Sequence, residues 1–264
     1  MPERLRAPPT PHPPHPTHPP THPPPRGETL SDSIRSLSCY ADVVVLRHPL
    51  VGSAAVAARA SRVPVLNAGD GVGEHPTQAL LDLFTILAER RAARSAEALA
   101  GVTVVMLGDL KHGRTTHSLL RVLALFGGVT LRFVSPPELR MPGELLALLS
   151  AAGIAHSCHE SLAELTPAGA SVLASADVLY VTRVQKERFA DAAQYERLRL
   201  AYVVTPELLR SGAKESLVIM HPLPRVGEID EAVDADPRAA YFRQMRNGMF
   251  VRMALLALVC GVEV

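Results

Sequence analysis

Six short runs of branched aliphatic residues constrain the fold of this chain more than any other feature of its sequence. None of the runs alternates apolar with polar residues, which is typical of strands buried on both faces of a parallel sheet. Helical patterns separate the runs, so the sequence predicts an α/β fold with parallel sheets. The predicted strands are 41–46, 63–66, 102–107, 129–134, 178–181 and 217–220, and the clearest predicted helices are 76–91, 116–126, 144–152 and 245–259.

The first 26 residues differ in composition from the rest of the chain. About half of the 23 prolines lie there, together with His12, His15, His18 and His22. Proline cannot donate to a backbone ladder, and the segment has almost nothing apolar to bury, so we expect a disordered or polyproline-II-like tail over 1–26. A metal-binding histidine tract is the alternative. Nothing in the spacing organises these imidazoles into a closed shell, and we expect no metal site.

A charged, alanine-rich segment at 89–99 separates two groups of predicted strands and predicts a domain boundary. We therefore expect one domain over 27–95 and a second over 96–240. The segment 245–259 is unusually apolar, and a helix of that kind is buried in most soluble proteins. We expect the C-terminal part, 241–264, to form a helix that packs back on the first domain.

Charge and cysteine content exclude several classes of protein. The formal net charge of +1 argues against a nucleic-acid partner bound through bulk positive charge. The three cysteines are widely spaced and outside any Cys-x-x-Cys pair, which argues against a disulfide framework and predicts a reducing, cytoplasmic location. No apolar run reaches the ~20 residues of a transmembrane helix, so we expect no membrane partner.

Cationic side chains follow five of the predicted strands. In open α/β sheets, ligands bind beyond the carboxyl ends of the strands, so these positions predict a site for a small, strongly anionic ligand. A single cation at such a place is more often a surface ion pair, and only the combination is informative. The cations are Arg47 and His48, His75, the group Lys111, His112 and Arg114, the group Arg183, Lys186 and Arg188, and the pair His221 and Arg225.

The motifs around these cations resemble aspartate carbamoyltransferases, most closely the form fused in the multifunctional animal pyrimidine-synthesis protein. The resemblance covers residues 27–261. It rests on Cys-Tyr-Ala-Asp at 39–42, Arg-His-Pro at 47–49, His-Pro-Thr-Gln at 75–78, Gly-Asp-Leu-Lys-His-Gly-Arg-Thr at 108–115, Thr-Arg-Val-Gln-Lys-Glu-Arg at 182–188 and His-Pro-Leu-Pro-Arg at 221–225.

The resemblance implies a fold of two Rossmann-like subdomains, each with a parallel sheet, of which the first is incomplete here. On this basis 27–95 would be a partial carbamoyl-phosphate domain and 96–240 the aspartate domain. The implied reaction transfers a carbamoyl group from carbamoyl phosphate to L-aspartate, giving N-carbamoyl-L-aspartate and phosphate in pyrimidine biosynthesis. The resemblance also implies a homotrimer and no metal or organic cofactor.

The same resemblance assigns roles to residues that match the family's motifs. Arg47 and His75 would be catalytic and would polarise the carbonyl oxygen of carbamoyl phosphate. The amide of Gln78 would hold the carbamoyl group, and the main-chain carbonyls of Leu223 and Pro224 would accept from the nitrogen groups of the substrates. Catalysis of this kind depends on orientation and on fixed positive groups around developing charge.

A second set of matching residues would hold aspartate. Arg114, Arg183 and Gln185 match the family's aspartate-binding positions, and a planar guanidinium suits a carboxylate because it can make two bonds to it. Arg26 stands where the family supplies a lysine from a neighbouring subunit. Arginine keeps the charge of that lysine but not its compact ammonium group.

The phosphate-loop motif of the family is absent from the chain. The comparison of motifs leaves two alternative functions, a non-catalytic subunit and an ornithine carbamoyltransferase. The chain contains no Ser-x-Arg-Thr phosphate loop, so we expect the isolated chain to be much less active than a full domain, with a non-catalytic subunit as the alternative. Ornithine carbamoyltransferase is the nearest enzymatic alternative. Its Ser-Met-Gly loop is missing here, and Pro222 replaces the cysteine of its His-Cys-Leu-Pro motif.

Overall fold

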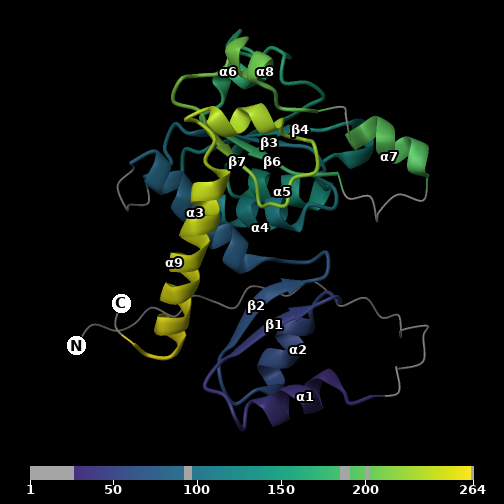
Figure 1. Cartoon of the computed structure of the whole chain (residues 1–264), viewed down its shortest axis with the longest axis vertical. Helices are drawn as coiled ribbons and strands as arrows, with labels where there is room; N and C mark the ends of the chain where they lie inside the picture. Colours follow the sequence, from purple (N-terminus) through teal and green to yellow (C-terminus); the bar gives the residue numbers. More distant parts are fainter. Residues whose placement is uncertain (1–26, 92–96, 185–190, 200–201, 263–264) are drawn as a thin grey trace.

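The computed structural model describes residues 27–91, 97–184, 191–199 and 202–262. The tail predicted at 1–26, including Arg26, and the predicted aspartate ligand Gln185 lie outside the described residues. Two parallel sheets of different size organise the described part of the chain, as the α/β pattern predicts (Figure 1). Within this part, no helix combines the length and the apolar content that a membrane span requires.

The larger sheet has five parallel strands in the order β5-β4-β3-β6-β7. The chain builds outward from β3 through β4 to β5 and then returns to place β6 on the other side of β3. The strand order therefore reverses between β3 and β6, which is where open α/β sheets leave a crevice. The strands are β3 (Thr103–Leu107), β4 (Thr130–Val134), β5 (Ala155–His159), β6 (Val178–Val181) and β7 (Val218–Met220).

Both faces of this sheet are buried, which explains why its central strands do not alternate. Val104 and Met106 of β3 belong to one hydrophobic cluster, and Val105 and Leu107 belong to a second cluster on the opposite face. Successive side chains of a strand point to opposite faces, so a strand covered on both sides must be apolar throughout. Figure 1 shows α4 and α5 on one side of the sheet and α6 and α8 on the other. The covering helices are α4 (Arg114–Leu123), α5 (Gly143–Ala151), α6 (Val172–Ser175) and α8 (Pro206–Arg210), with α7 (Ala192–Arg199) at the periphery.

The smaller sheet contains β1 (Val44–His48) and β2 (Val65–Asp70), paired in parallel. Helices α1 (Leu30–Leu37) and α2 (Ser53–Ala60) accompany it. Its core is formed by Ile34, Val44 and Ala57. The prediction that this first strand is buried on both faces is wrong, because Val45 is 60% exposed. Within the described residues, the apolar cluster lies on the Val44 side of β1 only.

Two long helices lie between the sheets: α3 (Pro76–Glu89) and α9 (Tyr241–Val259). They pack side by side, and α3 also packs against α4 (Figure 1). Ile86 of α3 belongs to the hydrophobic cluster of the larger sheet. That cluster therefore contains residues from both sides of the segment predicted as a domain boundary. The boundary itself stays a prediction.

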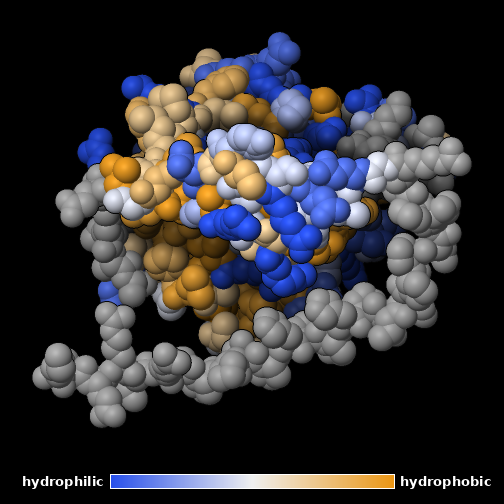
Figure 2. All heavy atoms as spheres, turned by 90° about the horizontal axis from the view of Figure 1, so that it is seen from below, coloured by the Kyte–Doolittle hydropathy of each residue, from blue (hydrophilic) through white to orange (hydrophobic). Residues whose placement is uncertain are grey.

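The expectation that the C-terminal helix is buried is wrong. Its buried positions are Tyr241, Gln244 and Gly248, a narrow stripe that faces its neighbour. Many apolar side chains of the helix therefore stay exposed. On the face of the molecule drawn in Figure 2, hydrophobic residues lie among hydrophilic ones. The large apolar side chains of α9 that are exposed are Phe242, Met245, Met249, Phe250, Met253, Leu256 and Leu258.

Gly108, directly after β3, marks a close approach between the carboxyl ends of β3 and β6. Its φ is +115°, and a Cβ there would lie 2.2 Å from the backbone oxygen of Thr182. A backbone oxygen cannot move aside without displacing the sheet. Any larger residue at this position is therefore disfavoured both by the positive φ and by overlap with that oxygen.

We expect Gly108→Ala to lower the free energy of unfolding by about 3 kcal/mol, through backbone strain and steric overlap. Gly143→Ala is the matched control: it begins α5 and has nothing within 4 Å of the added Cβ. That control should change stability by less than about 1 kcal/mol. Urea unfolding followed by circular dichroism measures both, and equal midpoints for the two variants would contradict the assignment.

Candidate active site

A pocket of about 360 Å³ lies at the carboxyl ends of strands from both sheets. Its size is within the usual range for small-molecule sites, and its position agrees with the reversal of strand order between β3 and β6. The carboxyl-terminal part of β1 and the segments that follow β2, β3, β6 and β7 contribute to its lining. The lining residues are Arg47, Gly71, His75, His112, Gly113, Arg114, Thr115, Thr182, Arg183, His221, Pro222, Leu223 and Pro224.

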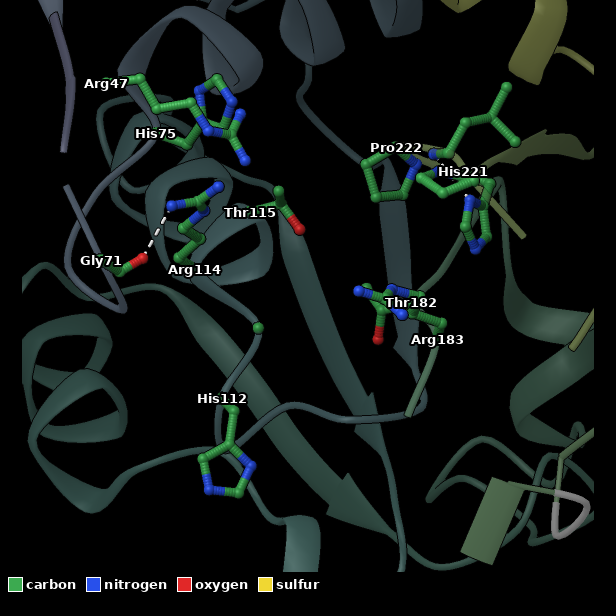
Figure 3. Close-up of a pocket in the computed structure, with 13 residues that line it drawn as sticks. Arg47, Gly71, His75, His112, Arg114, Thr115, Thr182, Arg183, His221 and Pro222 are labelled. Carbon is green, nitrogen blue, oxygen red and sulfur yellow. Dashed lines mark hydrogen bonds between the residues drawn. The ribbon is translucent and has the colours of Figure 1, made fainter. Parts of the chain in front are cut away.

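Arg47, His75 and Arg114 lie along one side of the pocket, as Figure 3 shows. Arg47 lies near the end of β1, His75 immediately precedes α3, and Arg114 is the first residue of α4. Arg114 donates from Nη1 to the carbonyl oxygen of Gly71 at 2.7 Å. A Cβ at Gly69 would lie 3.0 Å from that same nitrogen, so the glycine leaves room for the guanidinium.

Hydrogen bonds from α4 hold the backbone of His75 in place. The His75 amide donates to Ser118 Oγ at 2.8 Å, and Ser118 Oγ donates to the carboxylate of Glu74. Glu74 also pairs with Arg121 Nε at 2.8 Å. The preceding loop is closed by Asp70, which accepts from the amide of Glu74 at 2.7 Å. The imidazole therefore enters the pocket from a backbone that is fixed on both sides.

The surroundings of His75 keep its imidazole neutral at pH 7. Burial, together with the positive charges of Arg114, Arg47 and Arg252, lowers the pKa of His75 to about 4. A neutral imidazole can donate one hydrogen bond without adding to the positive charge of the site. It is suited to polarising a ligand's carbonyl oxygen.

The opposite side of the pocket is built by the segments after β6 and β7. Thr182 and Arg183 follow β6, and His221 follows β7 (Figure 3). The His221 ring is 1% exposed and accepts at Nδ1 from the amide of Leu223 at 2.8 Å. The proton must then be on Nε2, which donates to Glu228 Oε1 at 2.7 Å.

The backbone at Leu223 is held in an unusual conformation beside the pocket. Its φ is +51°, in the left-handed region, and the peptide bond to Pro224 is cis. Side chains other than glycine seldom adopt this region, and such positions cluster at functional sites. Leu223 and Pro224 both line the pocket.

Two family profiles together match nearly the whole described part of the chain. The profile of the carbamoyl-P binding domain of aspartate/ornithine carbamoyltransferase matches residues 21–88, and that of the Asp/Orn binding domain matches residues 100–259. The chain belongs to the aspartate/ornithine carbamoyltransferase family. Fusion proteins and single-function subunits are both among its relatives.

Sequence relatives of the chain include multifunctional proteins and aspartate carbamoyltransferase catalytic subunits. The chain is 52% identical to "Multifunctional protein CAD" of Squalus acanthias, over 89% of this chain and 10% of that protein. It is 48% identical to "Aspartate carbamoyltransferase catalytic subunit" of Methanopyrus kandleri, over 89% and 72% of the two chains. It thus spans about a tenth of the multifunctional proteins and somewhat over two thirds of the catalytic subunits that it matches.

Solved structures of aspartate transcarbamoylases resemble this chain in fold and sequence. The catalytic subunit of M. jannaschii aspartate transcarbamoylase superposes with a TM-score of 0.78 at 46% identity, covering 89% of this chain and 71% of that one. The Trypanosoma cruzi aspartate transcarbamoylase in complex with N-(phosphonacetyl)-L-aspartic acid gives a TM-score of 0.77 at 44% identity, over 90% and 71% of the chains.

The structure of this family member brings six of the predicted site residues to one pocket: Arg47, His75, Arg114, Arg183, Leu223 and Pro224. Gln78 lies one turn along α3 from His75, is 6% exposed, and is not among the residues that line the pocket. Its side chain donates to Asp82 Oδ1 at 2.8 Å. The assigned roles of all these residues, and of Gln185 and Arg26, stay predictions.

Sequence reasoning missed the residues that support the site from behind. Ser118, Asp82 and Gln244 lie within helices and belong to no motif, so their roles depend on contacts between distant segments. Asp82 did offer a signal, since it is a carboxylate in the apolar middle of the predicted helix 76–91. Among the described residues, no group of three or more His, Cys, Asp and Glu side chains is placed to hold a metal ion.

We expect the imidazole of His75 to titrate near pH 4 in the folded protein, measured by NMR at its Cε1–H group. The folded state binds the proton less tightly than the unfolded chain, so protonation destabilises the fold as the pH falls from 6.5 toward 4. The slope is at most about 1.4 kcal/mol per pH unit. His75→Gln should remove this component of acid destabilisation, whereas a titration midpoint near 6.5 would disprove the assignment.

Proposed function

We propose that this chain transfers a carbamoyl group from carbamoyl phosphate to L-aspartate, yielding N-carbamoyl-L-aspartate and phosphate for pyrimidine biosynthesis. The observation that supports this most strongly is the meeting of Arg47, His75, Arg114 and Arg183 in one pocket. Both substrates are anions, and a pocket with three guanidinium groups and a neutral imidazole offers charge complementarity to both. Related structures from T. cruzi contain carbamoyl phosphate and aspartate, which supports the same substrates here.

In the proposed reaction the aspartate amine attacks the carbonyl carbon of carbamoyl phosphate. A C–N bond forms, the C–O bond to phosphate breaks, and the amine transfers a proton to the departing phosphate, which leaves with the bonding electron pair. Arg47 and the neutral His75 donate to the carbonyl oxygen and stabilise the negative charge that develops on it. The carbonyls of Leu223 and Pro224 accept from the nitrogen groups and orient them, which lowers the entropic part of the barrier.

Arg114 and Arg183 would select an acidic amino acid. A guanidinium makes two parallel bonds to a carboxylate, and such pairs give geometric specificity in addition to charge. The two arginines approach the pocket from α4 and from the end of β6, on opposite sides (Figure 3). Gln185 and, from a neighbouring copy, Arg26 complete the proposed aspartate subsite. Gln78 completes the proposed carbamoyl subsite. Assembly as a homotrimer and a cytoplasmic location are further parts of this proposal, on the same resemblance.

The test is a carbamoylation assay with aspartate and ornithine as alternative acceptors. We expect aspartate to be the acceptor, and Arg183→Ala to lower kcat/KM for aspartate by about 30-fold to 1,000-fold, as for loss of one transition-state contact. Arg210→Ala is the matched control, because Arg210 pairs with Glu207 on the exposed surface of α8. It should retain wild-type activity. Turnover of ornithine in place of aspartate would refute the proposal.

The chain contains no Ser-x-Arg-Thr segment, and this favours a second candidate function as a non-catalytic subunit. For the same reason we expect lower activity than in a domain that carries the segment. Calorimetry with N-(phosphonacetyl)-L-aspartic acid separates the candidates. Tight binding by this chain alone counts against a purely non-catalytic role, whereas binding only in mixed assemblies with intact chains supports the non-catalytic subunit.

A further inference from the structure

A buried carboxylate behind the pocket receives hydrogen bonds from three separate elements. Asp82 on α3 is 0% exposed. Its Oδ1 accepts from Gln78 Nε2 at 2.8 Å and from Gln244 Nε2 of α9 at 2.6 Å. Its Oδ2 accepts from the hydroxyl of Tyr180 of β6 at 2.7 Å. The cluster thus joins α3, β6 and α9 within the protein interior.

The chemistry of the carboxylate fixes which way two glutamine amides face. An ionised carboxylate can only accept hydrogen bonds, so Gln78 and Gln244 must both turn their NH₂ groups toward Asp82. Each amide then presents its carbonyl oxygen elsewhere. For Gln244, that oxygen accepts from the backbone amide of His221 at 2.9 Å. For Gln78, the proposed function makes the carbonyl end the acceptor for a carbamoyl N–H.

The link to His221 reaches the pocket. His221 opens the 221–225 turn, and its ring in turn accepts from the amide of Leu223. A continuous series of hydrogen bonds therefore runs from Asp82 through Gln244 and His221 to Leu223, which lines the pocket. A second, shorter path runs from Asp82 to Gln78. Both paths start at Asp82 and end at groups assigned to the carbamoyl subsite, Gln78 in the first half of the chain and Leu223 in the second.

We propose that Asp82 is a positioning residue that orients both sides of the carbamoyl subsite, Gln78 directly and the 221–225 turn through Gln244. This inference rests on the proposed function, since it assigns Asp82 a role at the carbamoyl phosphate subsite. Stability alone is a poor reason for this arrangement. A buried carboxylate costs desolvation energy, and well-packed apolar side chains are often as stable or more so.

A neighbouring contact of the same helix pair supplies a matched control. One turn further along α3, Thr85 Oγ1 accepts from Asn247 Nδ2 of α9 at 3.1 Å. Thr85 is fully buried, as Asp82 is, but its contacts do not lead to the pocket. Thr85→Val therefore removes a buried α3–α9 hydrogen bond without touching either path to the carbamoyl subsite.

The experiment compares Asp82→Asn, Gln244→Leu and Thr85→Val with wild type at pH 8, where the burial-raised pKa of Asp82, about 7, leaves the carboxylate mostly ionised. Asparagine keeps the shape but offers an NH₂ group where an acceptor is required. We expect Asp82→Asn and Gln244→Leu to raise KM for carbamoyl phosphate about 10-fold, with KM for aspartate changed less than about 2-fold. Thr85→Val should lose a similar amount of thermal stability and keep both KM values.

A readout that does not depend on turnover separates this inference from the proposed function. Hydrogen exchange of the His221 amide should be at least about 10-fold faster in Asp82→Asn than in Thr85→Val, although residue 82 does not touch His221. If wild type is inactive, the proposed function fails and this exchange rate alone decides whether the link exists. Equal exchange in the two variants, or an unchanged KM for carbamoyl phosphate in an active Asp82→Asn protein, overturns the inference.

Discussion

The parallel alignment of the strands is the constraint on which the rest of the site depends. Because β3, β6 and β7 all run in the same direction, the segments after them emerge at one edge of the larger sheet. The reversal of strand order between β3 and β6 keeps the connecting helices on opposite faces and leaves that edge open. Gly108 permits the close approach of the two strand ends there. Cations far apart in sequence thereby face a common space.

Helix α3 connects this edge to the smaller sheet. It begins directly after the pocket residue His75, contributes Ile86 to the core of the larger sheet, and packs against both α4 and α9. The residues that fix its pocket end, Ser118 of α4 and Gln244 of α9, come from the other half of the chain. The site is therefore held by contacts between the two halves as much as by either sheet alone.

Local patterns in the sequence predicted the elements whose environment is uniform. The strand predicted at 178–181 has the same bounds as β6, because both of its faces are buried and every residue must be apolar. β5 was missed because it lies at the edge of the sheet and contains His156, Ser157 and His159, which are polar. The exposure of α9 could not be predicted either. The apolar content of a helix indicates its tendency to be buried, but it does not show whether another element packs against it.

For the candidate site, the lining residues could be predicted from the sequence, but the contacts that support them could not. Motifs identified the side chains that line the pocket, because strand ends in a parallel sheet converge by topology. They could not show that Gln78 turns toward Asp82, or that Gln244 reaches the amide of His221, because those contacts join residues more than 20 positions apart or depend on the facing of an amide. The supporting contacts follow from packing, which a linear pattern does not encode.

Among the buried groups whose pKa is shifted, His75 and Asp82 act on the fold in opposite directions when the pH falls. Below pH 6.5 the lowered pKa of His75 destabilises the folded state, because the unfolded chain binds the proton more tightly. Asp82 does the reverse: burial raises its pKa to about 7, so the folded state binds the proton more tightly and gains stability as the pH falls toward 3.8. Between pH 4 and 6.5 the two contributions offset each other.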